Sequence, residues 1–373
     1  MRLELVATCL FGLEHMLGEE IEALGYERIS TIDGRITFLA DEEGVALSNI
    51  FLRLAERIFI KLGAFRAESF EELFQGTRAL PWADFIGVND AFPVKGHAIK
   101  SKLFSIPDCQ AIVKKAVVDS LSERYGISRF PEEGIKYQIE FFILNDEATL
   151  MIDTSGVPLH KRGYRKEANL APIRETLAAA IAKTSRPRED VLFWDPMCGS
   201  GTIAIEAAMQ MRGIAPGVRR SFAAEAFPFI TRRTWADARE EAKEGERATQ
   251  FRVFASDIDL RALELAEHNA RRAGVLDSIK IFERDARRIT SGGMRATIVT
   301  NPPYGERLGS LSAVETLYRE IGERFRSLAP WQVYIITSHQ QFERFYGKRA
   351  DKVRKLYNGM IPCYLYQFFK NNK

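Results

Sequence analysis

Four consecutive residues, Asn301-Pro302-Pro303-Tyr304, could hold a flat amine or amide. Two successive prolines fix the backbone in a rigid extended turn and remove two N–H donors. The carbonyl oxygen of Pro302 and the side-chain oxygen of Asn301 can then accept the two hydrogens of an amino group, while the ring of Tyr304 stacks on a base. Positioning an amine for in-line attack provides much of the rate of a methyl transfer. We therefore expect these four residues to be catalytic in methyl transfer to nitrogen; the alternative is a proline turn that only closes a strand.

Residues 195–202, Asp-Pro-Met-Cys-Gly-Ser-Gly-Thr, form a glycine loop between a predicted strand and a predicted helix. With Ala204 they complete the pattern Gly-x-Gly-x-x-Ala. Glycines let the backbone approach a ligand, and a small third residue lets helix and strand pack closely. The loop favours a nucleotide-like cofactor, and the alternative is a tight strand-to-helix turn. We expect Asn301 and the following loop residues to contact the cofactor: Asp195, Pro196, Cys198, Gly199, Gly201 and Thr202.

Two acids follow the next two predicted strands. Asp257 ends one strand, and Asp285, next to Ala286, follows the other. Ligands of open parallel sheets bind at the carboxyl edge, where these side chains belong. We expect Asp257 to bind ribose hydroxyls, and Asp285 with Ala286 to contact an adenine. The alternatives are a helix cap, formed by Asp257 or Asp259, and a turn acid at Asp285.

An insert separates the glycine loop from Asp257. The acid of the second strand is expected roughly twenty residues after the glycines, but Gly201 and Asp257 are 257 − 201 = 56 positions apart. Residues 211–250 are rich in arginine and include Phe222, Phe227 and Trp235. This composition fits either an RNA-facing lobe or a solvated pair of helices, and we leave both open.

The elements that must position these motifs alternate from about residue 190 onward. Short apolar strands at 191–194, 251–255, 279–282, 296–300 and 332–337 are separated by helical patterns, which predicts a parallel sheet covered on both faces. Residues 352–357 and 363–369 flank Asn358-Gly359, which predicts an antiparallel hairpin at the edge of the sheet. Residues 1–60 and 61–155 form two smaller α+β modules, and a basic linker at 156–170 follows them.

Composition sets the broad class. The chain has 373 residues, 46% of them apolar and 28% charged, with a net charge of +3. This length predicts two or three domains, and the small net charge means that binding to nucleic acid requires local basic patches. The four cysteines are far apart, so we expect no metal site and a reducing, cytoplasmic location. No apolar stretch is long enough for a membrane span.

The motifs resemble those of class I S-adenosylmethionine (SAM) methyltransferases. The whole chain is similar to the bacterial THUMP-containing RNA guanine-N2 methyltransferases, which include the amino-terminal half of the rRNA enzyme RlmL and the YpsC group. The resemblance is carried by residues 159–165 joined to 171–178, by 195–202 with 301–308, and by 100–105. It implies an α/β fold with a ferredoxin-like module (1–60), a THUMP domain (61–155) and, after the linker, a Rossmann-like methyltransferase domain (171–373).

The resemblance also implies the reaction. We expect SAM as cofactor, the N2 amine of a guanine in 23S rRNA as acceptor, and RNA as partner. The alternatives are an N6-adenine methylase of DNA or RNA, because that class shares the Asn-Pro-Pro-Tyr run, and a THUMP protein that binds RNA without catalysis. We expect RNA contacts from Lys100, Lys102, Lys161, Arg162 and Arg165. Otherwise the lysines belong to a solvated face, and the linker cations pair with acids across the domain junction.

Overall fold

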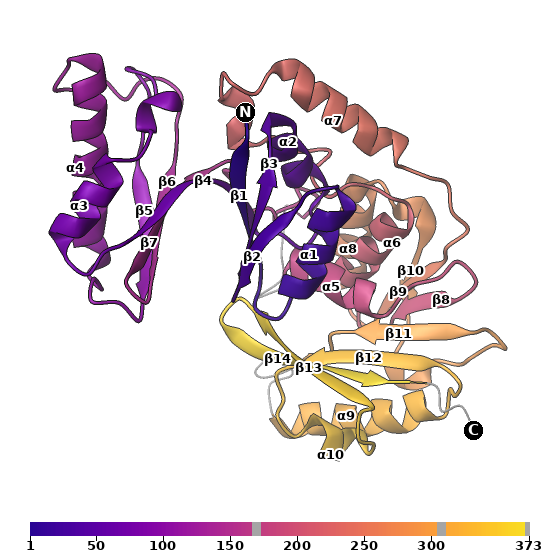
Figure 1. The fold of residues 1–373 in the computed structure, drawn as a ribbon. Coiled ribbons are helices and arrows are strands. Elements are labelled where there is room, and N and C mark those ends of the chain that lie inside the picture. The colour runs from indigo at the N-terminus through magenta and orange to yellow at the C-terminus, as the bar shows by residue number, and fades with distance from the viewer. Residues whose placement is uncertain (166–172, 304–310, 370–373) are drawn as a thin grey trace.

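Two seven-stranded sheets organise the chain in the computed structural model, which describes residues 1–165, 173–303 and 311–369 (Figure 1). The first sheet has the order β2-β3-β1-β4-β7-β6-β5. Its elements are β1 (Leu3–Thr8), α1 (Glu14–Ala23), β2 (Arg28–Ile32), β3 (Arg35–Ala40), α2 (Glu42–Phe51), β4 (Arg57–Arg66), α3 (Phe70–Arg78), β5 (Val94–Ile99), α4 (Ile106–Tyr125), β6 (Ile139–Leu144) and β7 (Glu147–Asp153). Helices α3 and α4 with β5–β7 form a lobe that projects from the rest of the molecule.

Strand β4 belongs to both amino-terminal modules. Its first half pairs with β1, from Arg57 opposite Thr8 to Lys61 opposite Glu4. The ladder with β7 continues to Arg66 opposite Glu147, after an irregularity between Lys61 and Gly63. The boundary predicted after residue 60 therefore falls inside a continuous strand, because the two modules share a sheet rather than a linker.

Local signals explain the helices of the projecting lobe. Ser69 and Glu72 form a capping box that starts α3, and Gly126, with φ +68°, ends α4 in the left-handed conformation. Among the described residues, no helix has both the length and the apolar character needed to cross a membrane.

The second sheet has the order β10-β9-β8-β11-β12-β14-β13. Its elements are α5 (Glu175–Thr184), β8 (Leu192–Asp195), α6 (Thr202–Met211), α7 (Arg232–Glu244), β9 (Val253–Asp257), α8 (Leu260–Ala273), β10 (Ile279–Glu283), β11 (Ala296–Thr300), α9 (Leu311–Arg326), β12 (Gln332–Thr337), α10 (Phe342–Tyr346), β13 (Lys352–Asn358) and β14 (Ile361–Phe368). Strands β8 to β12 are parallel, and β14 and β13 are antiparallel. The predicted parallel sheet with an antiparallel edge hairpin is present.

The insert after α6 joins two domains. The ring of Phe227, 1% exposed, stacks on Tyr137 of the projecting lobe with centroids 4.4 Å apart. Phe222 stacks on the buried Trp235 of α7. Arg220 donates to the carbonyls of Pro158 and Lys161 in the linker, at 3.0 Å each. An RNA-facing aromatic lobe does not fit this arrangement, because these aromatic rings are covered by protein.

Candidate active site

A cavity of about 1000 Å³ opens at the carboxyl ends of β8, β9, β10 and β11. Strand β8 has β9 on one side and β11 on the other, so the order of strands reverses at this point. Ligands of open parallel sheets bind in such a crevice. Most of the residues predicted to bind cofactor or acceptor line the cavity: Asp195, Pro196, Cys198, Gly199, Thr202, Asp257, Asp285, Ala286, Asn301 and Pro303.

Two predicted residues are absent from the cavity wall. Gly201 has φ +80° and begins α6, and a Cβ there would lie 3.1 Å from the Cβ of Ala266. Its glycine is therefore required by backbone conformation and by packing rather than by direct contact with a ligand. Pro302 is buried, and its neighbours Asn301 and Pro303 line the cavity on either side of it in the chain. Tyr304 lies outside the described residues.

The glycine loop is open toward the ligand at Gly199. This residue has φ +51°, and a Cβ added there would meet no atom within 4 Å. Its N–H donates to Oδ2 of Asp257 at 2.9 Å, which ties the loop to the end of β9. The neighbouring Cys198 is buried, and burial raises the pKa of its thiol well above the usual value. A neutral thiol in the loop is suited to packing and not to nucleophilic attack.

The two acids after Ser256 have different roles. Oδ1 of Asp257 accepts from the N–H groups of Ile258 and Asp259, at 2.8 and 3.1 Å. The cap of α8 is Asp259, whose Oδ1 accepts from the N–H of Arg261 at 2.9 Å. The helix-cap alternative for Asp257 is therefore excluded in favour of Asp259, and Asp257 lines the cavity with its two oxygens held by three backbone N–H groups.

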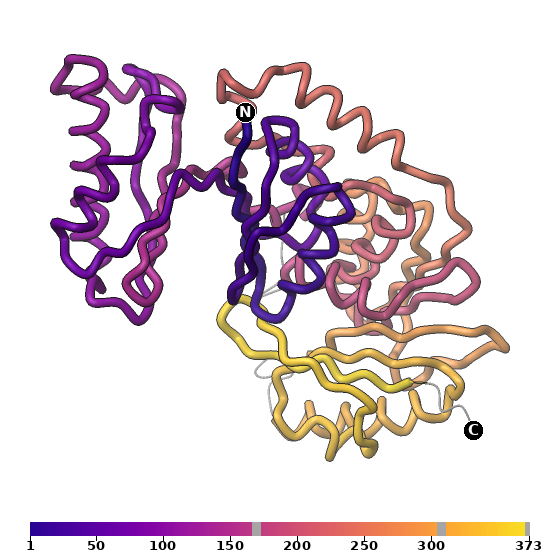
Figure 2. Tube along the Cα trace, viewed as in Figure 1, coloured from indigo at the N-terminus to yellow at the C-terminus, as the bar shows by residue number. Residues whose placement is uncertain are grey.

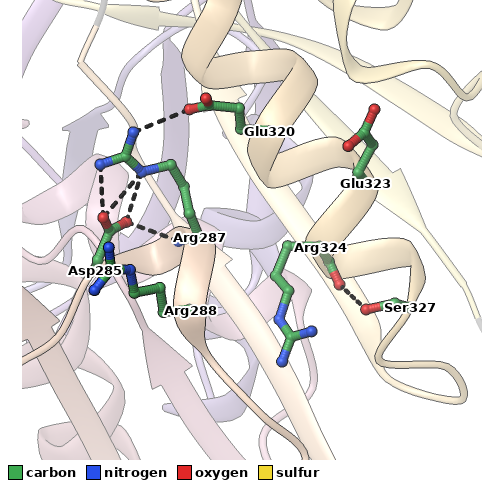
Figure 3. A pocket seen from close by; sticks show the side chains of 7 residues that line it. All are labelled: Asp285, Arg287, Arg288, Glu320, Glu323, Arg324 and Ser327. Atoms are coloured by element: carbon green, nitrogen blue, oxygen red, sulfur yellow. Dashed lines mark hydrogen bonds and ion pairs between the residues drawn. The ribbon is translucent and has the colours of Figure 1, made fainter.

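Asp285 is held by an arginine that the sequence reasoning did not single out. Arg287 donates through Nε to Oδ1 of Asp285 at 2.9 Å and through Nη2 to Oδ2 at 2.6 Å. Its Nη1 reaches Glu320 of α9 at 3.0 Å. These hydrogen bonds lower the pKa of Asp285, which keeps the carboxyl ionised. Figure 3 shows this bridge from the end of β10 to α9, beside a shallow cavity of about 530 Å³.

Other cavity residues were also missed. Ile258 and Asp259 line the wall directly after Asp257, so their place at the same strand end could have been inferred. Thr316 and Leu317 come from α9, and no motif links that helix to the loop. Its contribution follows from the three-dimensional fold alone.

Asp195 connects the two motifs. This carboxyl is buried, and burial raises its pKa to about 7, against the stabilising hydrogen bonds from Thr300 and the N–H of Met197. The hydroxyl of Thr300 donates to Oδ1 of Asp195 at 2.7 Å. Since Thr300 is the last residue of β11, the bond fixes the start of the Asn-Pro-Pro turn relative to the glycine loop.

The turn is also supported from behind. The carbonyl of Pro303 accepts from the hydroxyl of Tyr318, on α9, at 3.3 Å. The same hydroxyl lies 2.9 Å from Oγ1 of Thr337 at the end of β12. Asn301, Pro303 and the glycine loop thus face one cavity, with the turn held between β11, α9 and β12.

The linker arginines are structural. Arg162 is 5% exposed and donates to the carbonyl of Leu159 at 2.7 Å. Arg165 pairs with Glu175 of α5 at 3.0 Å and donates to the carbonyl of Ile173 at 2.9 Å. The hypothesis that these two side chains clamp RNA phosphate does not fit this placement, because both guanidinium groups are turned into the protein, where Arg162 pairs with Glu206 and Arg165 with Glu175. The alternative, pairing across the domain junction, describes them.

The predicted RNA-facing lysines are accessible. Lys100, Lys102 and Lys161 are solvent-facing. Lys102 forms an ion pair with Glu68, which also pairs with Arg66. An exposed pair of this kind contributes little to stability and can exchange partners. Contact of these lysines with RNA stays a prediction.

Glu56 joins the first module, the linker and the catalytic domain. Its carboxylate contacts Nδ1 of His160 and Nη1 of Arg174, both at 2.8 Å, and accepts from Thr176 at 2.5 Å. Burial would raise the pKa of Glu56, but the hydrogen bonds from His160 and Thr176 and the charge of Arg174 together lower it. An ionised carboxylate at this junction fixes the catalytic domain against the first module.

Comparisons with known proteins match the chain along its length. The sequence model of a protein family, described as the RMKL-like methyltransferase domain, matches residues 162–367, more than half of the chain. The chain belongs to this methyltransferase family. The RlmL ferredoxin-like domain matches residues 4–59 and the THUMP domain residues 67–153. These matches confirm the predicted family and fold class and identify the chain as a methyltransferase.

Three relatives illustrate the family. The protein "Putative RNA methyltransferase YpsC" of Bacillus subtilis (strain 168) is 43% identical over 98% of this chain and 95% of its own. A solved structure, SMU.472 complexed with SAH, is 41% identical with a TM-score of 0.93, covering 100% of this chain and 99% of the other. The structure titled "predicted N6-adenine-specific DNA methylase" from Listeria monocytogenes str. 4b F2365 is 44% identical with a TM-score of 0.94, covering 99% and 97%.

Proposed function

We propose that this protein transfers a methyl group from SAM to the exocyclic N2 amine of a guanine in RNA, with 23S rRNA as the substrate. The observation that carries the proposal is that Asn301 and Pro303 face the same cavity as the glycine loop. The hydrogen bond from Thr300 to Asp195 fixes this arrangement. The THUMP match and the description of YpsC as an RNA methyltransferase support RNA as the substrate class.

The residues present fit the cofactor. The bare backbone at Gly199 leaves room beside the loop. The carboxylates of Asp257 and Asp285 lie on the wall, at the ends of successive strands, where a ribose and an adenine amino group would be bound. The bound SAH in SMU.472 supports the same class of ligand. When bound, SAM supplies an electrophilic methyl group.

The chain's own residues then position the acceptor. The side-chain oxygen of Asn301 and the carbonyl of Pro302 accept the two amine hydrogens, which directs the nitrogen lone pair toward the cofactor. The hydrogen bond from the hydroxyl of Tyr318 to the carbonyl of Pro303 keeps the turn in place while the base enters. A pinned amine needs no strong base, because its nitrogen becomes acidic as the new bond forms. Positioning of the acceptor amine is the main contribution expected from this turn.

A second candidate, methylation of adenine N6, uses the same turn and is favoured by the description of the Listeria protein as an N6-adenine-specific DNA methylase. The test is transfer of labelled methyl groups to 23S rRNA, tRNA and DNA from a strain deleted for the gene, followed by mass spectrometry of the nucleosides. We expect N2-methylguanosine in 23S rRNA. Label found only in DNA adenine would establish the second candidate instead.

A further inference from the structure

The β13–β14 hairpin extends past the carboxyl edge of the parallel strands (Figure 2). Strand β12 ends at Thr337, which lies opposite Tyr364 of β14. Tyr364 in turn lies opposite Lys355 of β13. Both strands of the hairpin continue for three more residues, to the pair Asn358 and Ile361. At about 3.3 Å per residue, the hairpin therefore reaches about 10 Å beyond the end of β12.

This edge also holds the acceptor turn. Thr337, the last residue of β12, contacts the hydroxyl of Tyr318, and that hydroxyl donates to the carbonyl of Pro303. On the other side, the N–H of Arg174 donates to Oδ1 of Asn358 in the hairpin at 3.3 Å. The residue before Arg174, Ile173, lines the cavity. The projecting end of the hairpin consequently lies close to residues that line the cavity or support its wall.

The tip of the hairpin is apolar. Gly359, with φ +67°, and Met360 are the two central residues of the turn. Met360 is 93% exposed and Ile361 is 48% exposed. Turns of this kind ordinarily carry polar residues, so apolar side chains here are available for contact with another molecule.

The tip is also held firmly. The ring of Tyr357 packs edge-on against Phe11 of the first module, with centroids 5.7 Å apart. Next to Phe11, Gly12 has φ +89°, and a Cβ there would lie 3.1 Å from the carbonyl oxygen of Lys355. This close approach anchors the hairpin to the first module. Because the tip is already ordered, binding of a partner there would cost little conformational entropy.

Charge indicates what the hairpin contacts. Strand β13 carries Lys352, Arg354 and Lys355, and neither β13 nor β14 contains an acid. The nearby Glu14 is turned toward the backbone N–H groups of Gly12 and Gly34, at 2.9 and 2.8 Å. A cationic strand that ends in an apolar tip fits a polyanion with unpaired bases. A base drawn into a catalytic pocket leaves its neighbours unstacked, and apolar side chains commonly cover them.

We propose that the hairpin is an RNA-binding finger, in which Met360 and Ile361 pack against a nucleobase next to the methylated one and Lys355 binds a backbone phosphate. The inference rests on the proposed function, because it takes the acceptor to be a base extruded from RNA.

The test measures methyl transfer from labelled SAM to RNA purified from a strain deleted for the gene. Met360→Ser should lower kcat/KM about tenfold, and Met360→Leu should retain the activity because it keeps an apolar tip. Lys355→Glu should reduce the slope of log binding constant against log salt concentration by about one, the value expected for loss of a single phosphate contact. The matched control is Lys280→Glu, at an exposed lysine on β10, the opposite edge strand of the same sheet. SAH affinity, measured by calorimetry, should be unchanged in all four variants.

Two outcomes would overturn the inference in distinguishable ways. If the wild-type protein labels RNA and the Met360→Ser and Lys355→Glu variants match it at every salt concentration, the finger does not bind RNA and the tip serves a protein partner or none. If the wild-type protein labels no RNA, the proposed function itself fails.

Discussion

The hydroxyl of Thr300 donates a 2.7 Å hydrogen bond to Oδ1 of Asp195, and this bond joins the last residues of two adjacent parallel strands. One strand leads into the glycine loop and the other into the Asn-Pro-Pro turn. The relative position of the two motifs is therefore set by a buried bond between neighbours in the sheet. Changes at this pair should affect stability and activity together.

Replacing Thr300 by valine keeps the shape of the side chain but removes the donor. Loss of one hydrogen bond to the buried carboxyl should lower the free energy of unfolding by about 1–3 kcal/mol. Urea denaturation followed by circular dichroism measures the change. Thr184→Val is the matched control, because that hydroxyl bonds to the carbonyl of Ala180 within α5 and does not line the cavity. Equal effects of the two variants would contradict a special role for Thr300.

Asp195 should make stability depend on pH. Its pKa of about 7 in the folded protein exceeds the ordinary value of 3.8. Between these values the folded state holds a proton that the unfolded state has released, so the contribution of Asp195 to stability falls as pH rises toward 7. In Asp195→Asn this component should be absent. The measurement is the difference in unfolding free energy between wild type and variant from pH 4 to 8; parallel curves would refute the prediction.

Asn301→Ala should separate chemistry from cofactor binding. Loss of one of the two proposed amine acceptors should reduce kcat by about a hundredfold, since positioning carries the rate. The affinity for SAH should change little, because the loop and the two carboxylates remain. Single-turnover methylation and calorimetry give the two quantities. Unchanged turnover would remove Asn301 from its assigned role.

Two acids at the cavity, Asp285 and Asp259, should affect different quantities when replaced: cofactor affinity for the first and stability for the second. Asp285→Ala should weaken SAH binding by about tenfold or more, as expected for loss of a hydrogen bond to a charged group. Asp259→Ala should instead lower stability by about 1 kcal/mol, because that side chain caps α8. Calorimetry and denaturation on both variants test the distinction. The reverse pattern would mean that the two roles have been assigned to the wrong acids.

Much of the catalytic domain could be predicted from sequence, because its signals are local. The glycine loop, the strand ends at Asp257 and Asp285 and the edge hairpin each depend on residues close together in the chain. Arg162 and Arg165 could not be assigned in the same way, since a run of cations has the same pattern whether it is solvated or paired inside the protein. The stacking of Phe227 on Tyr137 and the bridge from Arg287 to Glu320 join distant parts of the sequence. Periodicity carries no information about such pairs.

The strand shared by the two amino-terminal modules has a practical consequence. Strand β4 pairs on one side with β1 and on the other with β7. A fragment that lacks either module therefore leaves one edge of β4 with unpaired backbone N–H and C=O groups. Exposed strand edges of this kind pair with other chains and promote aggregation. Truncation near residue 60 should thus yield fragments that aggregate and dissolve poorly. A better truncation point lies after β7, where both modules of the first sheet stay together.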